Sequence, residues 1–248
     1  MRTIVCVFAV SLFIIAATPH ALRAQVDLDI ETGIAFSGYN DVRVPGKGGT
    51  DISLSEELEA DAEVFYRIRV LYHFSERHHL GALYAPLTIH SAGQINRALV
   101  FEGETFPAKT PLESSYKFNS YRLFYRYDFL RNDDLEIGAG FTAKIRDARI
   151  AVEGGGRSSE KTNVGFVPII HFRLLWKFAG DVALLLDGDA LAAPQGRAED
   201  VLAALLYSAT DRLQLKAGYR ILEGGADNDE VYSFTLINYA SVGAIYRF

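Results

Sequence analysis

Apolar and polar residues alternate with a period of two over most of the chain. Between Tyr121 and Phe129 every second residue is apolar or aromatic, and the positions between them include Arg122, Arg126 and Asp128. Successive side chains of a β-strand point to opposite faces, so this pattern predicts a strand with one apolar face and one polar face.

Ten segments show this pattern or one close to it, and they predict ten strands. Two of them, 181–192 and 199–209, are rich in Ala and Leu, which also favour helices. Gly188 and Pro194 argue against a continuous helix there. The predicted strands cover residues 26–38, 56–74, 79–92, 113–130, 134–152, 161–178, 181–192, 199–209, 212–223 and 230–248.

The connections between these strands are of two kinds. Four are tight turns, at residues 75–78, 131–133, 179–180 and 210–211. The other five are generally longer and rich in Gly, Pro, Ser, Asn and charge, at residues 38–56, 93–112, 153–160, 193–198 and 224–229. Short and long connections alternate, which is typical of barrels with short periplasmic turns and longer extracellular loops. We therefore expect an all-β, up-and-down antiparallel transmembrane β-barrel of about ten strands, with eight or twelve as alternatives.

The N-terminus has the pattern of a secretory signal peptide. Arg2 precedes an apolar run from Ile4 to Ala17, and the small residue Ala24 precedes Gln25. The run is shorter than the roughly 20 residues that a membrane-spanning helix needs. We expect cleavage after residue 24, which leaves an exported barrel domain of residues 25–248.

Composition agrees with this picture and excludes other classes. The chain has 248 residues, a formal net charge of −6, one Cys, 13 Tyr and 16 Phe. The acidic balance argues against nucleic-acid binding. A single Cys excludes a disulfide scaffold. Aromatic residues are favoured at the membrane interface, which accounts for their number.

The C-terminal segment resembles a known class. The chain ends in Phe248, with Tyr246, Ala244 and Val242 on the same face of the last strand. This resembles the terminal strand of Gram-negative outer-membrane barrels of the OmpA/OmpW-like class, which the barrel-assembly machinery recognises. The resemblance implies an outer-membrane location, contact with outer-membrane lipid and lipopolysaccharide, and an assembly signal at Tyr246 and Phe248. It does not imply an activity.

Opposite the apolar faces, charged residues are expected to line the lumen. The interior of a ten-stranded barrel is only somewhat wider than that of an eight-stranded one, which side chains fill. We expect opposite charges to pair across strands and the monomer to act structurally or to bind ligands or partners through its extracellular loops. A narrow channel for small anionic solutes is the alternative. The expected lumen residues are Asp27, Asp29, Glu31, Arg67, Arg69, Arg122, Arg126, Lys144, Arg146, His171, Arg173, Asp187, Asp189, Lys216 and Arg220.

No residue set predicts catalysis, a metal site or a cofactor. An outer-membrane lipid-modifying enzyme is the third candidate function, and His90 is its candidate base because it lies near the outer rim, where Ser114 or Ser115 could approach it. A solvated rim residue is the competing interpretation. The acidic segment 223–230 does not match the spacing of an EF-hand loop.

The two largest predicted loops carry apolar residues that suggest binding. Loops on a rigid scaffold are where binding usually occurs. The candidates for contact with lipopolysaccharide or a partner protein are Val42, Val44, Phe101 and Phe106.

Overall fold

The computed structural model describes residues 25–193 and 196–248, and these residues form an all-β structure. The predicted signal peptide lies outside the described residues. None of the described residues forms a helix that is long and apolar enough to cross a membrane. The strands are β1 (Gln25–Arg43), β2 (Ile52–Ser53), β3 (Glu63–His73), β4 (His78–Ala85), β5 (Thr88–Gln94), β6 (Leu99–Phe101), β7 (Glu104–Phe106), β8 (Pro111–Arg131), β9 (Leu135–Gly154), β10 (Arg157–Ala179), β11 (Val182–Ala193), β12 (Gly196–Ser208), β13 (Leu213–Asp227) and β14 (Tyr232–Arg247).

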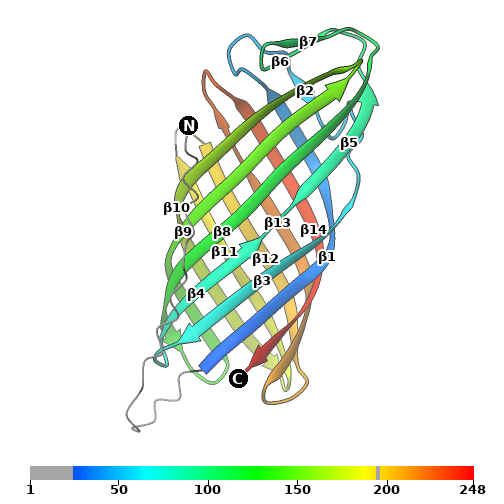
Figure 1. Cartoon of the computed structure of the whole chain (residues 1–248). Coiled ribbons are helices and arrows are strands. Elements are labelled where there is room, and N and C mark those ends of the chain that lie inside the picture. The colour runs from blue at the N-terminus through cyan, green and yellow to red at the C-terminus, as the bar shows by residue number, and fades with distance from the viewer. Residues whose placement is uncertain (1–24, 194–195) are drawn as a thin grey trace, which may run out of the picture.

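These strands close into a tilted antiparallel barrel, as Figure 1 shows. Neighbouring strands follow the order of the chain, and β14 pairs with β1 to close the ring. Strands β4 and β5 together form one position in the wall, so the barrel has ten positions. The prediction of a ten-stranded up-and-down barrel is confirmed. Strand β2 and the β6–β7 hairpin lie outside this ring.

Because the wall position is interrupted between β4 and β5, β3 has no continuous ladder with β5, and we call this gap in the pairing the seam between β3 and β5. Pro86, which has no backbone N–H to give to a ladder, separates β4 from β5. Strand β4 pairs with β3 over six residue pairs, from Ile68↔Tyr84 to His73↔His79. Toward the loop end, the described residues that precede β3 share one isolated bridge with β5, between Ala60 and Ser91.

The barrel has two different ends (Figure 1). Both Gln25 and Phe248 lie at one of them, which we call the terminal end, together with the turns at residues 74–77, 132–134, 180–181 and 209–212. The opposite end, the loop end, carries the first loop (residues 44–62) and the second loop (residues 95–110).

Some predicted loops at the loop end are strand instead. Strands β9 and β10 stay paired up to Gly154↔Arg157, so only residues 155–156 form the turn. Gly155 and Gly156 both have positive φ, at 59° and 77°, which suits a two-residue hairpin turn. Similarly, β13 and β14 pair up to Asp227↔Tyr232. Much of the difference in connection length is therefore a difference in how far the hairpins project.

The predicted strand 56–74 is too long at its start, since β3 begins at Glu63. The preceding residues fold into turns that bring Leu54 and Leu58 into an apolar cap. The cap covers the loop end and consists of Val42, Val44, Ile52, Leu54, Leu58, Ile95, Leu99, Phe101, Phe106, Leu112, Tyr116, Ile150 and Val152.

Burial in this cap corrects one expectation. Val42, Val44, Phe101 and Phe106 are at most 1% exposed, so they are not free to contact lipopolysaccharide or a partner. They occupy every second position of strand extensions and short hairpins, and they face one another there.

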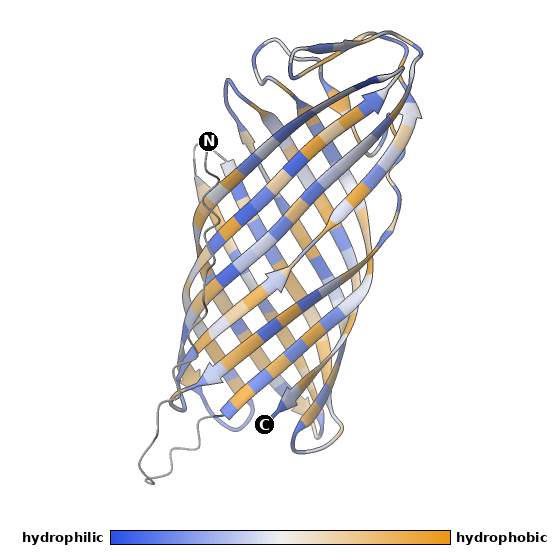
Figure 2. Cartoon of the chain, in the orientation of Figure 1, coloured by the Kyte–Doolittle hydropathy of each residue, from blue (hydrophilic) through white to orange (hydrophobic). Residues whose placement is uncertain are grey.

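The outer wall of the barrel is apolar, and Figure 2 shows the alternation of hydropathy along the strands. Val64, Phe141, Val164 and Phe166 are each 67–75% exposed. An apolar surface of this extent suits a barrel surrounded by lipid.

Inside the barrel, two apolar layers lie at different heights. The upper layer, toward the loop end, consists of Ala35, Phe65, Leu87, Ile89, Leu222, Ile237 and Tyr239. The lower layer, toward the terminal end, consists of Leu175, Ala183, Leu185, Leu202, Ala204, Leu206 and Ile245.

Candidate functional site

A belt of charged side chains lies between the upper and lower layers. Its members occupy inward positions of the wall, and the positions between them on each strand face outward. This charge belt consists of Asp29, Glu31, Arg67, Arg69, Arg122, His171, Arg173, Asp187, Asp189, Asp200, Lys216 and Arg220.

Asp200 on β12 is the centre of the belt and is 1% exposed. It accepts a hydrogen bond from Arg67 of β3 at 2.9 Å. It also pairs with Arg122 of β8 and with Arg220 of the neighbouring strand β13. Because β3 and β8 lie far from β12 around the ring, two of these bonds cross the lumen.

Two acids on β11 extend the belt toward β10 and β3. Asp189 accepts hydrogen bonds from His171 Nδ1 at 3.0 Å and from Thr142 Oγ1 at 2.6 Å, and it also pairs with Arg122. Asp187 is fully buried and accepts a hydrogen bond from Arg69 at 2.8 Å.

Glu31 on β1 completes the belt on the opposite wall. Arg220 donates two hydrogen bonds to it, at 2.8 and 2.9 Å. Lys216 donates to Glu31 at 3.1 Å and to Asp29 at 2.5 Å. A chain of ion pairs therefore runs from β1 through β13 and β12 to β8 and β11.

Of the residues expected in the lumen, four lie outside this belt. Asp27 and Arg126 are at the terminal end, and Lys144 and Arg146 face a cavity at the loop end. Sequence reasoning missed Asp200, because the other inward residues of its strand, such as Leu202, are apolar and hide the single acid.

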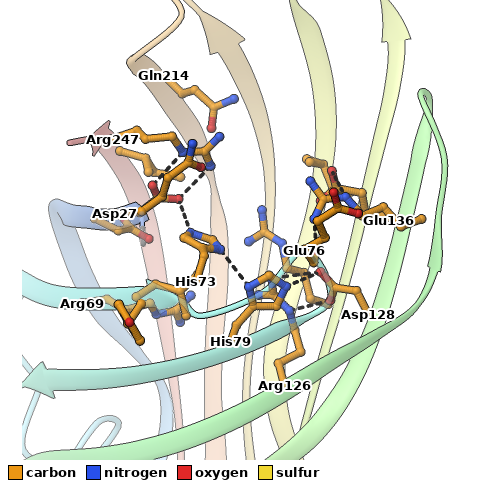
Figure 3. A pocket seen from close by; sticks show the side chains of 18 of the residues that line it. Asp27, Arg69, His73, Glu76, His79, Arg126, Asp128, Glu136, Gln214 and Arg247 are labelled. Atoms are coloured by element: carbon orange, nitrogen blue, oxygen red, sulfur yellow. Dashed lines mark hydrogen bonds and ion pairs between the residues drawn. The ribbon is translucent and has the colours of Figure 1, made fainter. Parts of the chain in front are cut away.

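A pocket of about 590 Å³ opens beside the lower layer at the terminal end. A chain of hydrogen bonds crosses it, as Figure 3 shows. Arg247 donates to Asp27 at 2.8 and 2.9 Å, and His73 Nε2 lies 2.9 Å from Asp27. The Nδ1 atoms of His73 and His79 are 2.7 Å apart.

The far end of this chain is a second carboxylate. His79 Nε2 lies 2.6 Å from Asp128, which also accepts a hydrogen bond from Arg126 at 2.7 Å. The predicted lumen residues do not include Asp128, although it lies two residues after Arg126 and therefore on the same inward face of β8.

The two rings lie in line between the two carboxylates. Each Nε2 faces a carboxylate oxygen, which accepts, so each Nε2 donates. The two Nδ1 atoms face each other across the turn that joins β3 and β4. A continuous line of polar side chains therefore joins Asp27 to Asp128 across the pocket.

The candidate base His90 has a different partner from the one expected. Its Nδ1 lies 2.7 Å from Glu63, and its side chain is 60% exposed. Ser115 is its register partner on β8, yet among the described residues no hydrogen bond joins His90 to Ser114 or Ser115. His90 of β5 and Glu63 of β3 therefore bridge the seam by a side-chain hydrogen bond.

Two solved structures are similar in fold. The outer membrane protease OmpT from Escherichia coli is 11% identical, with a TM-score of 0.57 over 92% of this chain and 99% of that one. The transport unit of the autotransporter AIDA-I from Escherichia coli is 7% identical, with a TM-score of 0.50 over 95% of this chain and 94% of that one. No family model and no curated protein matches the chain.

The fold therefore defines the class. The chain has the fold of the small β-barrels found in the outer membranes of Gram-negative bacteria, and the predicted resemblance to that class is confirmed at the level of the fold. These similarities extend to the fold alone.

Proposed function

We propose that this protein is an outer-membrane barrel closed to solute flow, with a structural or binding role at its loop end. The observation that carries this proposal is the charge belt, whose ion pairs cross the lumen between two apolar layers. In this proposal the terminal end faces the periplasm and the loop end faces outward.

The belt opposes a continuous aqueous path for two reasons. Long Arg side chains occupy the space that a ten-stranded barrel leaves. Separating a buried ion pair is also unfavourable, because it leaves uncompensated charge; the cost is about 3–5 kcal/mol when one partner is removed. An ion would have to displace pairs such as Arg220 and Glu31, which hold each other by two hydrogen bonds.

The loop end supports a binding role because its two loops form one fixed surface. Glu102 N donates to Val44 O at 2.8 Å, which links the second loop to the first. Arg97 donates to both carboxylate oxygens of Glu57, at 2.5 and 2.8 Å. The apolar cap packs beneath these links. A fixed polar surface of this kind suits contact with lipopolysaccharide or a partner protein.

Contacts with the membrane and with the assembly machinery belong to the same proposal. The apolar outer wall meets outer-membrane lipid. Tyr246 and Phe248, which are 39% and 65% exposed at the terminal end, serve as the assembly signal.

Conductance in planar bilayers tests the closed barrel. We expect the wild-type protein to give no stable unitary steps. The double variant Arg122→Ala with Asp200→Ala removes two opposite charges from the centre of the belt and should allow small, irregular currents. The matched control Asp211→Ala changes a turn residue at the terminal end and should stay silent. Stable unitary steps from the wild type, with anion preference, would favour the channel instead.

The lipid-modifying enzyme has less support, because His90 bonds to Glu63 rather than to a serine. Mass spectra of lipid A from cells with and without the protein test it. A modification that disappears in the His90→Ala variant would replace the binding proposal with an enzymatic one.

A further inference from the structure

A second cavity lies inside the barrel on the loop-end side of the charge belt. Its volume is about 360 Å³, within the range of small-molecule pockets. We call it the loop-end cavity. Small inward residues of β9, β12 and β13 leave this space open, namely Ala148, Ala198, Gly224 and Ala226.

The lining of the loop-end cavity is amphipathic. Lys144 lies nearest the charge belt, since it is the register partner of Arg122. Arg146 follows on the same face of β9, one step closer to the loop end. The apolar part of the lining consists of Phe118, Ile150, Val167, Leu191, Leu222 and Val231.

Lys144 differs from the cations of the charge belt, each of which pairs with a carboxylate. It is 3% exposed. Among the described residues, no carboxylate oxygen lies within 4.0 Å of its Nζ and no hydrogen bond joins it to another group. Its ammonium lies 4.9 Å from the centre of the Phe118 ring.

Arg146 is also without a carboxylate partner in the described part of the chain. It donates one hydrogen bond, to the side-chain oxygen of Asn163 at 2.6 Å. Its Nε is buried and has no partner among these residues. Two cations therefore face the cavity with unused hydrogen-bond donors.

We propose that the loop-end cavity binds a small monocarboxylate with an apolar body. The carboxylate pairs with Lys144 and Arg146, and the apolar body packs against residues such as Val167 and Leu222. A buried charge without a partner is unfavourable, and an anion at this position supplies the missing partner. The carboxylates Glu223 and Glu230 also line the cavity, so the anion is placed at Lys144 and Arg146, and the apolar part of the lining favours an amphiphile over a fully hydrated ion.

Binding to the barrel in lipid nanodiscs tests the ligand class. The probes are 4-phenylbutyrate, its neutral analogue 4-phenylbutanol, and inorganic phosphate, each titrated by calorimetry. We expect 4-phenylbutyrate to bind at least tenfold more tightly than the other two. Equal binding of the alcohol would show that charge has no role. Equal binding of phosphate would show that the cavity binds small anions in general and would overturn the proposal that the ligand needs an apolar body.

Two variants test the residues. Lys144→Met should weaken 4-phenylbutyrate about ten- to a hundred-fold, as expected for loss of a hydrogen bond to a charged group, and leave 4-phenylbutanol unchanged. Ala198→Phe fills the cavity and should abolish carboxylate binding while both cations remain. Lys177→Met, at the terminal end, is the matched control and should bind like the wild type.

Stability without ligand separates a binding residue from a structural one. Lys144→Met removes a buried unpaired charge, so its midpoint of urea unfolding should equal or exceed that of the wild type. A lower midpoint, or failure to fold, would show that Lys144 holds the barrel together and would overturn the proposal.

Discussion

Replacing Asp200 with Asn removes one negative charge from the centre of the charge belt and keeps the size of the side chain. Arg122 and Arg220 retain other carboxylate partners after this change. Arg67 does not, because Asp200 is its one carboxylate partner among the described residues. The effect should therefore concentrate at Arg67, which is 5% exposed.

The magnitude follows from this geometry. Removing one partner of a buried ion pair costs about 3–5 kcal/mol. The Asn side chain still accepts a hydrogen bond, so we expect the lower end of that range, about 3 kcal/mol. With a urea dependence of about 1–3 kcal/mol per M, the unfolding midpoint should fall by about 1–3 M.

The assay is urea unfolding of the barrel in phospholipid vesicles, followed by the fluorescence of Trp176. This residue is the single Trp of the chain and lies on the outer wall, 49% exposed. Asp211→Asn, at an exposed turn, is the control and should stay within about 0.5 kcal/mol of the wild type. Adding Arg67→Met to Asp200→Asn should recover much of the loss. A loss below about 1 kcal/mol for Asp200→Asn would refute the role given to the belt.

Three further predictions concern the loop end and the C-terminus. The hydrogen bond from Arg97 lowers the pKa of Glu57, so the link should stabilise the cap at neutral pH and weaken as the pH falls through that lowered pKa. The opening free energy of the cap amides, taken from hydrogen exchange corrected for the intrinsic effect of pH on amide exchange, should fall in acid by less than about 1 kcal/mol because the pair is partly exposed, and it should fall less in Glu57→Gln. Phe106→Ala should cost about 3–5 kcal/mol of cap stability and expose residues 95–110 to protease, while the barrel keeps its unboiled gel mobility; an intact second loop would contradict the cap. Deleting Phe248 should reduce the amount of assembled barrel in cells but leave refolding in detergent unchanged. Assembly in cells equal to that of the wild type would contradict the proposal that Phe248 is part of the assembly signal.

The sequence was sufficient to predict the barrel because alternation is a local property. The alternation from Tyr121 to Phe129 predicts a strand without any knowledge of the neighbouring strands, and this segment lies within β8. The loop end was less accessible. Whether the residues near Gly155 form a loop or a hairpin depends on the pairing between β9 and β10. The polar composition of these residues is typical of a loop, so the sequence does not indicate the pairing.

The interior was harder to predict than the wall. Whether a side chain faces inward follows from the local alternation of its own strand. Which charged side chain it pairs with depends on which strands face each other across the lumen. The pairing of Arg67 with Asp200 joins residues that are 133 positions apart. The contact between His73 and His79 is not evident from the sequence, because the two residues lie on either side of a turn and meet through the antiparallel register of β3 and β4.

The seam between β3 and β5 gives the wall a preferred line of separation. On either side of it, the long ladders of β1 with β14 and of β8 with β9 must break many hydrogen bonds together. At the loop-end half of the seam, the described backbone contributes the Ala60–Ser91 bridge and a hydrogen bond from Asp61 N to His90 O at 2.8 Å. Under heat or mechanical load, the ring should therefore first open sideways at this point, toward the surrounding lipid, while the rest of the cylinder stays intact.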